Sequence, residues 1–164
     1  MNFLEVSLIC SILSCTLVTG FTLLYAVVIM PGLSKLDDKE FIKAFQVTDG
    51  VIQDNQPLFI LIWLGSVISV VGAILSSIIS VGLPEAWLIV FVGVVYLLGV
   101  QGITLSVHLP LNNHIKKINI EKTAHQTLSV EREKFETRWN FFNTIRTGIS
   151  FSVSLTLLLV IALR

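Results

Sequence analysis

Four long stretches of the chain carry no charge, and they limit the possible folds more than any other feature. Asp, Glu, Lys and Arg are absent from residues 6–34, 55–84, 86–115 and 147–163. A helix that crosses a membrane needs about 17–25 predominantly apolar residues. We therefore predict an all-α membrane protein, a four-transmembrane-helix bundle that forms a single domain over residues 1–164. The predicted spans lie near residues 4–30, 57–80, 86–108 and 139–163.

Composition excludes two other classes of protein. Hydrophobic residues make up 54% of the chain and charged residues only 13%, about half the share of an ordinary soluble domain. A soluble all-α core is excluded because four such runs would leave almost no polar surface to face water. The formal net charge is zero, so the chain lacks the basic patch that nucleic-acid binding requires.

Lys and Arg gather in two connections, residues 31–56 and 109–138. The positive-inside rule predicts that both long connections are cytoplasmic, which puts the N and C termini outside. A chain with four such spans is expected to have the lipid bilayer as a partner.

Small residues recur at helical spacing in the spans, as at Gly65, Ser69 and Gly72. Such faces favour close helix packing and leave a homo-oligomer open.

The connection between the first two spans contains a predicted cytoplasmic amphipathic helix near residues 38–54. Asp37 is its expected N-cap. Apolar and charged positions separate on the helix: one face holds Phe41, Phe45, Thr48 and Ile52, and Lys39, Lys43 and Asp49 fall elsewhere. The last helix is expected to start near residue 130, before its span, with Ser129 as N-cap.

A polar face ends the third span. Gln101, Thr104 and His108 follow at α-helical spacing and so share one side of a helix. Pro110 is expected to end or kink that helix. Asn112 follows immediately.

A second polar face opens the fourth helix. Spacings of three and four place five side chains together: Arg132, Glu136, Trp139, Asn143 and Arg146. Arg146 lies inside the span, where a guanidinium is costly unless it faces the bundle interior and a partner. The candidate carboxylate partners are Asp49, Asp54 and Glu136.

The two polar faces predict a cavity at the cytoplasmic end of the bundle, with the helix at 38–54 as its lid. The expected lining is Gln101, His108, Asn112, Trp139, Asn143 and Arg146.

Each of these residues also has a structural interpretation. Arg146 can snorkel to the interface, Trp139 can belong to an aromatic belt, and His108 can simply end a helix. His114 and His125 are expected in a solvated loop. A three-histidine metal site remains an alternative, but the histidines lack tight ligand spacing, and we expect neither metal nor cofactor.

The same residues carry a family resemblance. Pro110-Leu111-Asn112 after the third span, and W-x3-N-x2-R (Trp139, Asn143, Arg146) opening the fourth, resemble the anthrone oxygenase-like integral membrane proteins. Many bacterial members of that family are known as a domain of unknown function. The likeness extends over most of the chain: a first span that ends in Met30-Pro31-Gly32, a cytoplasmic helix and then three more spans. His108 stands where the family arrangement N-x-P-x-N has its first Asn.

The resemblance implies a cofactor-independent monooxygenase in a bacterial inner (plasma) membrane. Similar fungal enzymes oxidise a polycyclic anthrone to an anthraquinone with molecular oxygen, without metal or flavin. On this hypothesis His108 is the base, and Asn112, Asn143 and Arg146 hold the oxyanion. Trp139 stacks on an apolar ring substrate, and Gln101 and Thr104 help to bind it.

Two alternatives to an enzyme remain open. One is a non-enzymatic membrane bundle that binds a lipid, a quinone-like ligand or a partner protein. The other is a small oligomeric transporter, although the sequence has no internal repeat and no carboxylate within a span for ion coupling.

Overall fold

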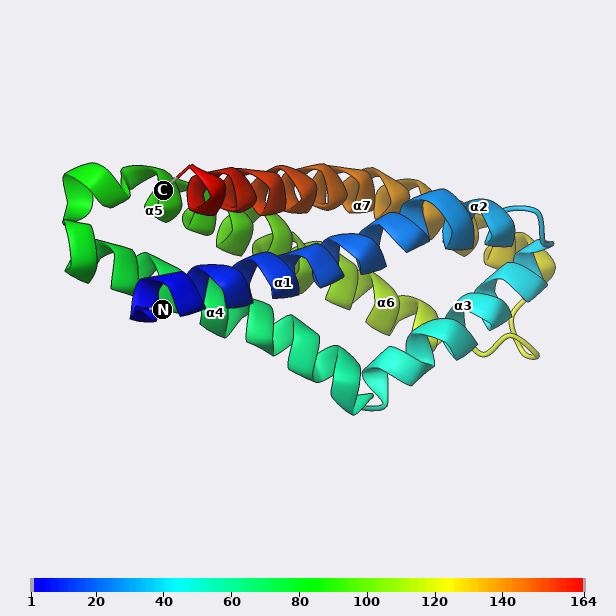
Figure 1. Ribbon diagram of the computed structural model, residues 1–164. Helices are drawn as coiled ribbons and strands as arrows, with labels where there is room; N and C mark the ends of the chain where they lie inside the picture. Colours follow the sequence, from blue (N-terminus) through cyan, green and yellow to red (C-terminus); the bar gives the residue numbers. More distant parts are fainter. Residues whose placement is uncertain (1, 164) are drawn as a thin grey trace.

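The computed structural model describes residues 2–163, which form helices and short connections and no strand. Figure 1 shows the elements as labelled along the chain. They are α1 (Phe3–Leu24), the π-helical η1 (Tyr25–Ile29), α2 (Met30–Leu33), α3 (Asp38–Gln53), α4 (Pro57–Val81), α5 (Leu83–Tyr96), the π-helical η2 (Leu97–Gly102) and η3 (Thr104–His108), α6 (Leu109–Lys116) and α7 (His125–Ala162).

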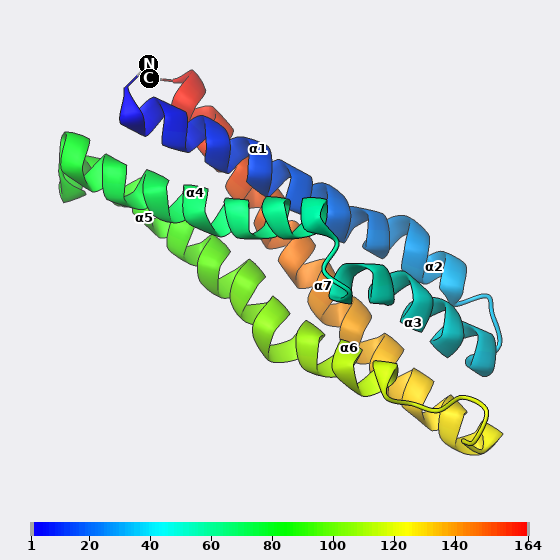
Figure 2. The same ribbon diagram turned by 90° about the horizontal axis from the view of Figure 1, so that it is seen from below.

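These elements join into four continuous helices that are long and apolar enough to cross a membrane. They run over Phe3–Leu33, Pro57–Val81, Leu83–Lys116 and His125–Ala162. The start of α1 and the end of α7 lie at the same end of the bundle (Figures 1 and 2). The predicted four-span membrane fold is therefore confirmed.

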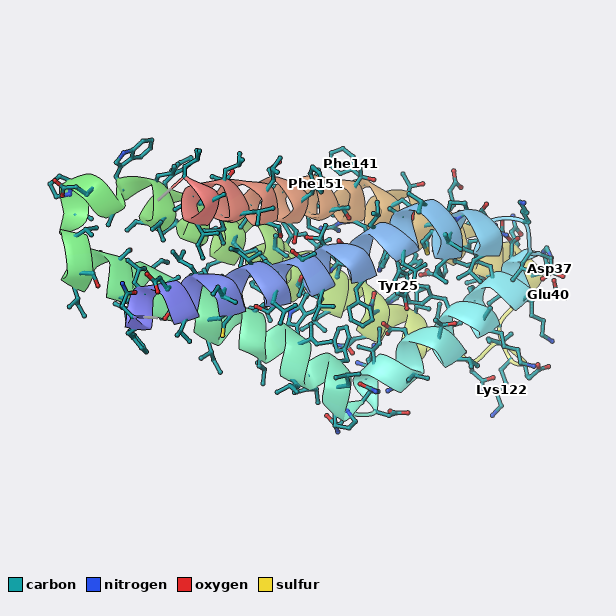
Figure 3. All side chains as sticks on the ribbon, viewed as in Figure 1. Tyr25, Asp37, Glu40, Lys122, Phe141 and Phe151 are labelled. Carbon is teal, nitrogen blue, oxygen red and sulfur yellow. The ribbon has the colours of Figure 1, made fainter. Side chains whose placement is uncertain are left out.

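The inner faces of the four helices bury one apolar core near the termini. Leu8 and Val18 of α1 meet Val70 of α4, Tyr96 of α5 and Val153 of α7 there. Hydroxyl groups join neighbouring helices within this core, as between Thr19 and Ser150, whose oxygens are 2.7 Å apart. The outer faces remain apolar and exposed, as a lipid-facing surface requires. Phe141 and Phe151, for example, project from the outer side of α7 (Figure 3).

A second core lies at the opposite end, where α3 crosses the bundle; we call this the α3 end. Asp37 caps α3 by accepting a 2.8 Å hydrogen bond from the Glu40 amide, as predicted. The helix buries Phe41 and Phe45 against Phe135 of α7. Charged side chains, including Asp37, Glu40 and Lys122, gather at this end (Figure 3).

Pro110 does not end the third helix, which runs on to Lys116. The residues just before it adopt the wider π-helical form in η2 and η3, and Pro110 sits in the first turn of α6. Local π-helical adjustment is one way a membrane helix tolerates proline, because it satisfies the carbonyls that the missing N–H leaves free.

The start of α7 also differs from the prediction. The helix begins at His125, with Ala124 in the N-cap position, so Ser129 lies inside it. Arg132 and Glu136, which were expected on one face of this helix, form an ion pair at 3.1 Å. Arg132 also donates to the carbonyl of Leu36 at 2.8 Å, which ties the α2–α3 connection to α7.

Gly93 provides a test of the packing between α4 and α5. A Cβ atom there would lie 2.7 Å from Ile74 Cδ1 and 2.8 Å from Ile74 Cγ1. Gly93→Ala should therefore lower the free energy of unfolding by about 1–3 kcal/mol through overpacking. Gly20→Ala is the matched control, since a Cβ at Gly20 meets nothing within 4 Å and alanine favours a helix. Thermal unfolding of both purified variants would measure the difference. Equal unfolding temperatures would contradict the packing described here.

Candidate functional site

A cavity of about 210 Å³ lies at the α3 end, with walls from every long helix and from α3. Its lining is mainly apolar, with a few polar side chains among aromatic and aliphatic ones. This is the usual make-up of a small-molecule site. The lining residues are Phe21, Thr22, Tyr25, Asp49, Ile52, Gln53, Phe59, Trp63, Thr104, Leu105, His108, Leu109, Asn112, Trp139 and Arg146.

Arg146 is buried in the cavity wall and is held by neutral groups. Its Nε donates to Asn143 Oδ1 at 3.0 Å, and its Nη1 donates to Thr104 Oγ1 at 3.1 Å. The guanidinium carbon lies 5.9 Å from the ring centre of Trp63 and 5.7 Å from that of Trp139. Such cation–π contacts stabilise a desolvated cation.

None of the three predicted carboxylate partners pairs with Arg146. Asp54 pairs with Lys116 at 3.3 Å, and Glu136 pairs with Arg132. Asp49 lines the same cavity but accepts its hydrogen bonds from Asn112 and Gln53. Within residues 2–163 no carboxylate therefore forms an ion pair with the guanidinium, although the charge of Asp49 acts on it across the cavity. The Nη2 group of Arg146 has no hydrogen-bond partner among the described residues.

His108 lines the cavity with only 2% of its surface exposed. Neither Nδ1 nor Nε2 has a hydrogen-bond partner among the described residues. The imidazole stands edge-on to Trp139, with ring centres 5.0 Å apart. Buried polar atoms are nearly always paired, so an orphaned pair of ring nitrogens at a cavity needs an explanation. A ligand in the cavity would supply the missing partner.

Two π-helical segments face each other across the cavity. Tyr25 lies in η1, and Thr104 and His108 lie in η3. Tyr25 sits on the side of the first helix that faces α3 (Figure 3). A π-helical turn takes up an extra residue and widens the helix, and such turns are common at functional sites.

Gln101 and Asn143 lie next to the cavity without being among its lining residues. Gln101 donates to Tyr96 Oη at 3.1 Å and to Ser66 Oγ at 3.3 Å. It thus points toward α4, because η2 breaks the α-helical spacing that would align it with Thr104. Asn143 donates to the Thr22 carbonyl at 3.0 Å while accepting from Arg146. Its amide oxygen therefore holds the guanidinium, and its amide nitrogen is bonded to the first helix.

A chain of hydrogen bonds links α3 to α7 through Asn112. Trp139 Nε1 donates to Asn112 Oδ1 at 3.0 Å, and Asn112 Nδ2 donates to Asp49 Oδ1 at 2.8 Å. Asn112 therefore fixes the indole of Trp139 on one side and a carboxyl group of α3 on the other.

Asp49 is the cavity residue whose place the α3 pattern did not predict. It was expected away from the apolar face, but it is buried against α6. Burial raises the pKa of its carboxyl group, and the hydrogen bonds from Gln53 and Asn112 and the charges of Lys116 and Arg146 offset only part of that rise. The sequence also did not predict that Phe59 and Trp63 of α4 line the cavity, since both are ordinary apolar residues of a predicted span.

The other two histidines do not line the cavity, and each lies in a helix rather than in the expected solvated loop. His114 is exposed and pairs with Glu131, and His125 begins α7. Residues 2–163 contain no group of three His, Cys, Asp or Glu side chains that could hold a metal ion.

Comparison with known proteins adds one finding to this geometry. The sequence model of the anthrone oxygenase family matches residues 54–156. The chain belongs to this family. The matched range runs from the end of α3 to the last third of α7, so it contains all seven predicted site residues of this anthrone oxygenase family member. No curated protein matches the chain, and no solved structure does.

Asp49 gives the site a testable pH dependence. Its pKa is raised in the folded protein, so the folded state binds more protons than the unfolded state at pH values between the ordinary Asp value of about 3.9 and the raised value. Stability should therefore increase as the pH falls through this window. Asp49→Asn should remove that contribution and unfold at a higher temperature than the wild type at pH 8. A difference of about 1 kcal/mol corresponds to about 2–4 °C for a chain of this size.

The measurement is the unfolding temperature of both proteins in one detergent from pH 4 to pH 8. Asp54→Asn is the control, because Asp54 is exposed and pairs with Lys116 at the surface. Parallel curves for the wild type and Asp49→Asn would rule out the buried carboxyl as the cause.

Proposed function

We propose that this membrane protein is a cofactor-independent monooxygenase that oxidises an apolar polycyclic anthrone-like substrate with molecular oxygen. The observation that carries the proposal is that one apolar cavity is lined by an imidazole without a hydrogen-bond partner, His108, and by a guanidinium without an ion-pair partner, Arg146. Family membership supports the same chemistry. An apolar cavity of about 150 Å³ is already enough to bind benzene, so about 210 Å³ open on one side accepts a larger ring system.

The reaction converts a ring methylene opposite a carbonyl group into a second carbonyl. A base removes one methylene proton and leaves an electron-rich enolate, whose negative charge lies mainly on oxygen. The enolate carbon then bonds to one atom of O₂, and the resulting peroxide anion takes back the proton from the base to give a hydroperoxide. Loss of the second methylene hydrogen as a proton, with cleavage of the O–O bond, gives the quinone and a hydroxide ion, which takes up that proton and leaves as water.

In the proposed roles, His108 is the base that takes the methylene proton, since its nitrogens are free of protein partners. Arg146 binds the enolate oxygen with its unpaired Nη2 group, in a site that excludes water. Trp139 packs against the ring. Thr104 contacts Arg146 from the cavity wall.

The two asparagines have supporting roles in this scheme rather than direct ones. Asn143 orients the guanidinium of Arg146, and Asn112 orients the indole of Trp139. Gln101 acts through the packing of α4 against the third helix. We further propose the topology that the positive-inside rule predicts, with the α3 end in the cytoplasm of a bacterium.

The rival function is a binding protein for a lipid or quinone-like ring that performs no chemistry. The same cavity supports it, because a bound carbonyl oxygen would satisfy His108 and Arg146 equally well. Only turnover separates the two functions.

Replacement of His108 tests the proposed chemistry. His108→Ala should lower anthrone oxidation by at least 100-fold, since general-base catalysis contributes about 10²–10⁴-fold, and should leave the unfolding temperature nearly unchanged. His114→Ala is the matched control, because His114 is exposed and lies outside the cavity. Oxygen uptake and quinone absorbance in vesicles would measure the rate. Full activity in His108→Ala would overturn the assignment, and no oxygen uptake by the wild type with any anthrone would favour the binding protein.

Arg146→Lys tests the role of the guanidinium. A lysine keeps the charge, but its single ammonium nitrogen lacks the planar fork with which Arg146 reaches Asn143, Thr104 and a ligand oxygen from separate nitrogens. We expect kcat to fall at least tenfold while the protein still binds anthraquinone, measured as quenching of tryptophan fluorescence. Unchanged kcat would show that Arg146 only packs the bundle.

A further inference from the structure

One side of the cavity at the α3 end is formed by two helices that diverge from each other, α4 and the helix that contains η3 and α6. Figure 2 shows α4 and the α5–α6 helix in contact near the termini and diverging toward α3. Phe59 and Trp63 stand on the α4 side of this gap, and Leu105 and Leu109 stand on the other side. All four residues line the cavity. Both of these diverging helices therefore contribute to the wall of the cavity.

That side reaches the outer surface of the bundle. Leu105 lines the cavity and is nevertheless 65% exposed, and Leu109 is exposed as well. Both residues belong to a helix that crosses the membrane. A leucine that faces a cavity and the lipid together marks the rim of an opening into the lipid.

An ion pair marks the level of the aqueous surface from which the depth of this rim in the membrane can be judged. Asp54, just before α4, pairs with Lys116, the last residue of α6, and both side chains are well exposed to water. At 1.5 Å per residue, Phe59 lies about 7 Å and Leu109 about 10 Å along their helices from that pair. Both sides of the opening thus lie just within the hydrocarbon layer.

The aqueous end of the cavity is closed by α3. Gln46 donates to the carbonyls of Ile115 at 2.8 Å and Ile118 at 3.0 Å. Asp49 is bonded to Asn112. Together with the Asp54–Lys116 pair, these contacts fasten the C-terminal half of α3 to α6 and to the residues that follow it.

We propose that the cavity is loaded sideways from the bilayer, through the opening between α4 and η3–α6, by a flat ring compound dissolved in the lipid. The proposal rests on the proposed function for the class of ring. It adds the route and the residues that control it: Phe59 and Trp63 on one side, Leu105 and Leu109 on the other. The route suits a ligand with little solubility in water, because no step exposes the ring to the aqueous phase.

The test is a rate of loading in lipid nanodiscs. Anthraquinone is the probe, and its arrival in the cavity is followed by stopped-flow quenching of tryptophan fluorescence, since Trp63 and Trp139 line the cavity. The narrowed variant carries Leu105→Phe and Leu109→Phe. The control carries Leu61→Phe and Leu64→Phe, on exposed α4 residues outside the cavity lining, of which Leu61 is 68% exposed.

We expect the narrowed variant to load at least tenfold more slowly than the wild type with the same final quenching, and the control to load at the wild-type rate. The same final quenching shows that the cavity is intact. If the double variant loses that quenching, Leu105→Phe alone is measured in the same way.

Equal loading rates in the narrowed variant and the control would overturn the lateral route. So would faster loading in Lys116→Gln, which loosens the aqueous end, because that result would show entry past α3. A wild-type protein that shows no saturable quenching would instead refute the proposed ring ligand itself. The two failures are therefore distinguishable.

Discussion

The arrangement of the α3 end depends on keeping one positive charge inside a membrane helix. An arginine cannot lose its proton in a protein, and a guanidinium in a span is tolerated only with suitable partners. Here Asn143, Thr104 and two indole rings surround Arg146, and no carboxylate within 4 Å neutralises it among the described residues. An arginine paired with a carboxylate would offer a ligand little net attraction. Neutral partners leave the charge available to an incoming oxygen.

The fourth helix shows what a sequence pattern can predict about such a site. Trp139, Asn143 and Arg146 follow α-helical spacing, and α7 is α-helical throughout, so their shared face could be read from residue numbers. The four spans could be predicted equally well from the sequence, because the length of an uncharged stretch can be compared directly with the length that a bilayer requires of a helix.

The third helix shows where the same reasoning fails. Gln101 was expected beside Thr104 and His108, but η2 and η3 replace the α-helical pitch in that stretch. Spacing rules assume that pitch, and the sequence around Pro110 does not say where the extra residue is taken up. Asp49 escaped prediction for another reason. Its burial depends on Asn112, which is 63 residues away in the chain, and a local pattern carries no information about that contact.

The π-helical segments also decide which genetic changes this fold can accept. Each residue of an α-helix turns the chain by about 100°, so removing one residue between Leu97 and Thr104 leaves the site in place only if a π-helical turn returns to the α-helical pitch. Without that return, His108 would leave the cavity, while every side chain in the helix kept its identity. In this stretch the position of His108 therefore depends on the number of residues as well as on their identity. A variant of this stretch can therefore change many residue types and still present His108 to the cavity, but the π-helical turns have to take up any change of length.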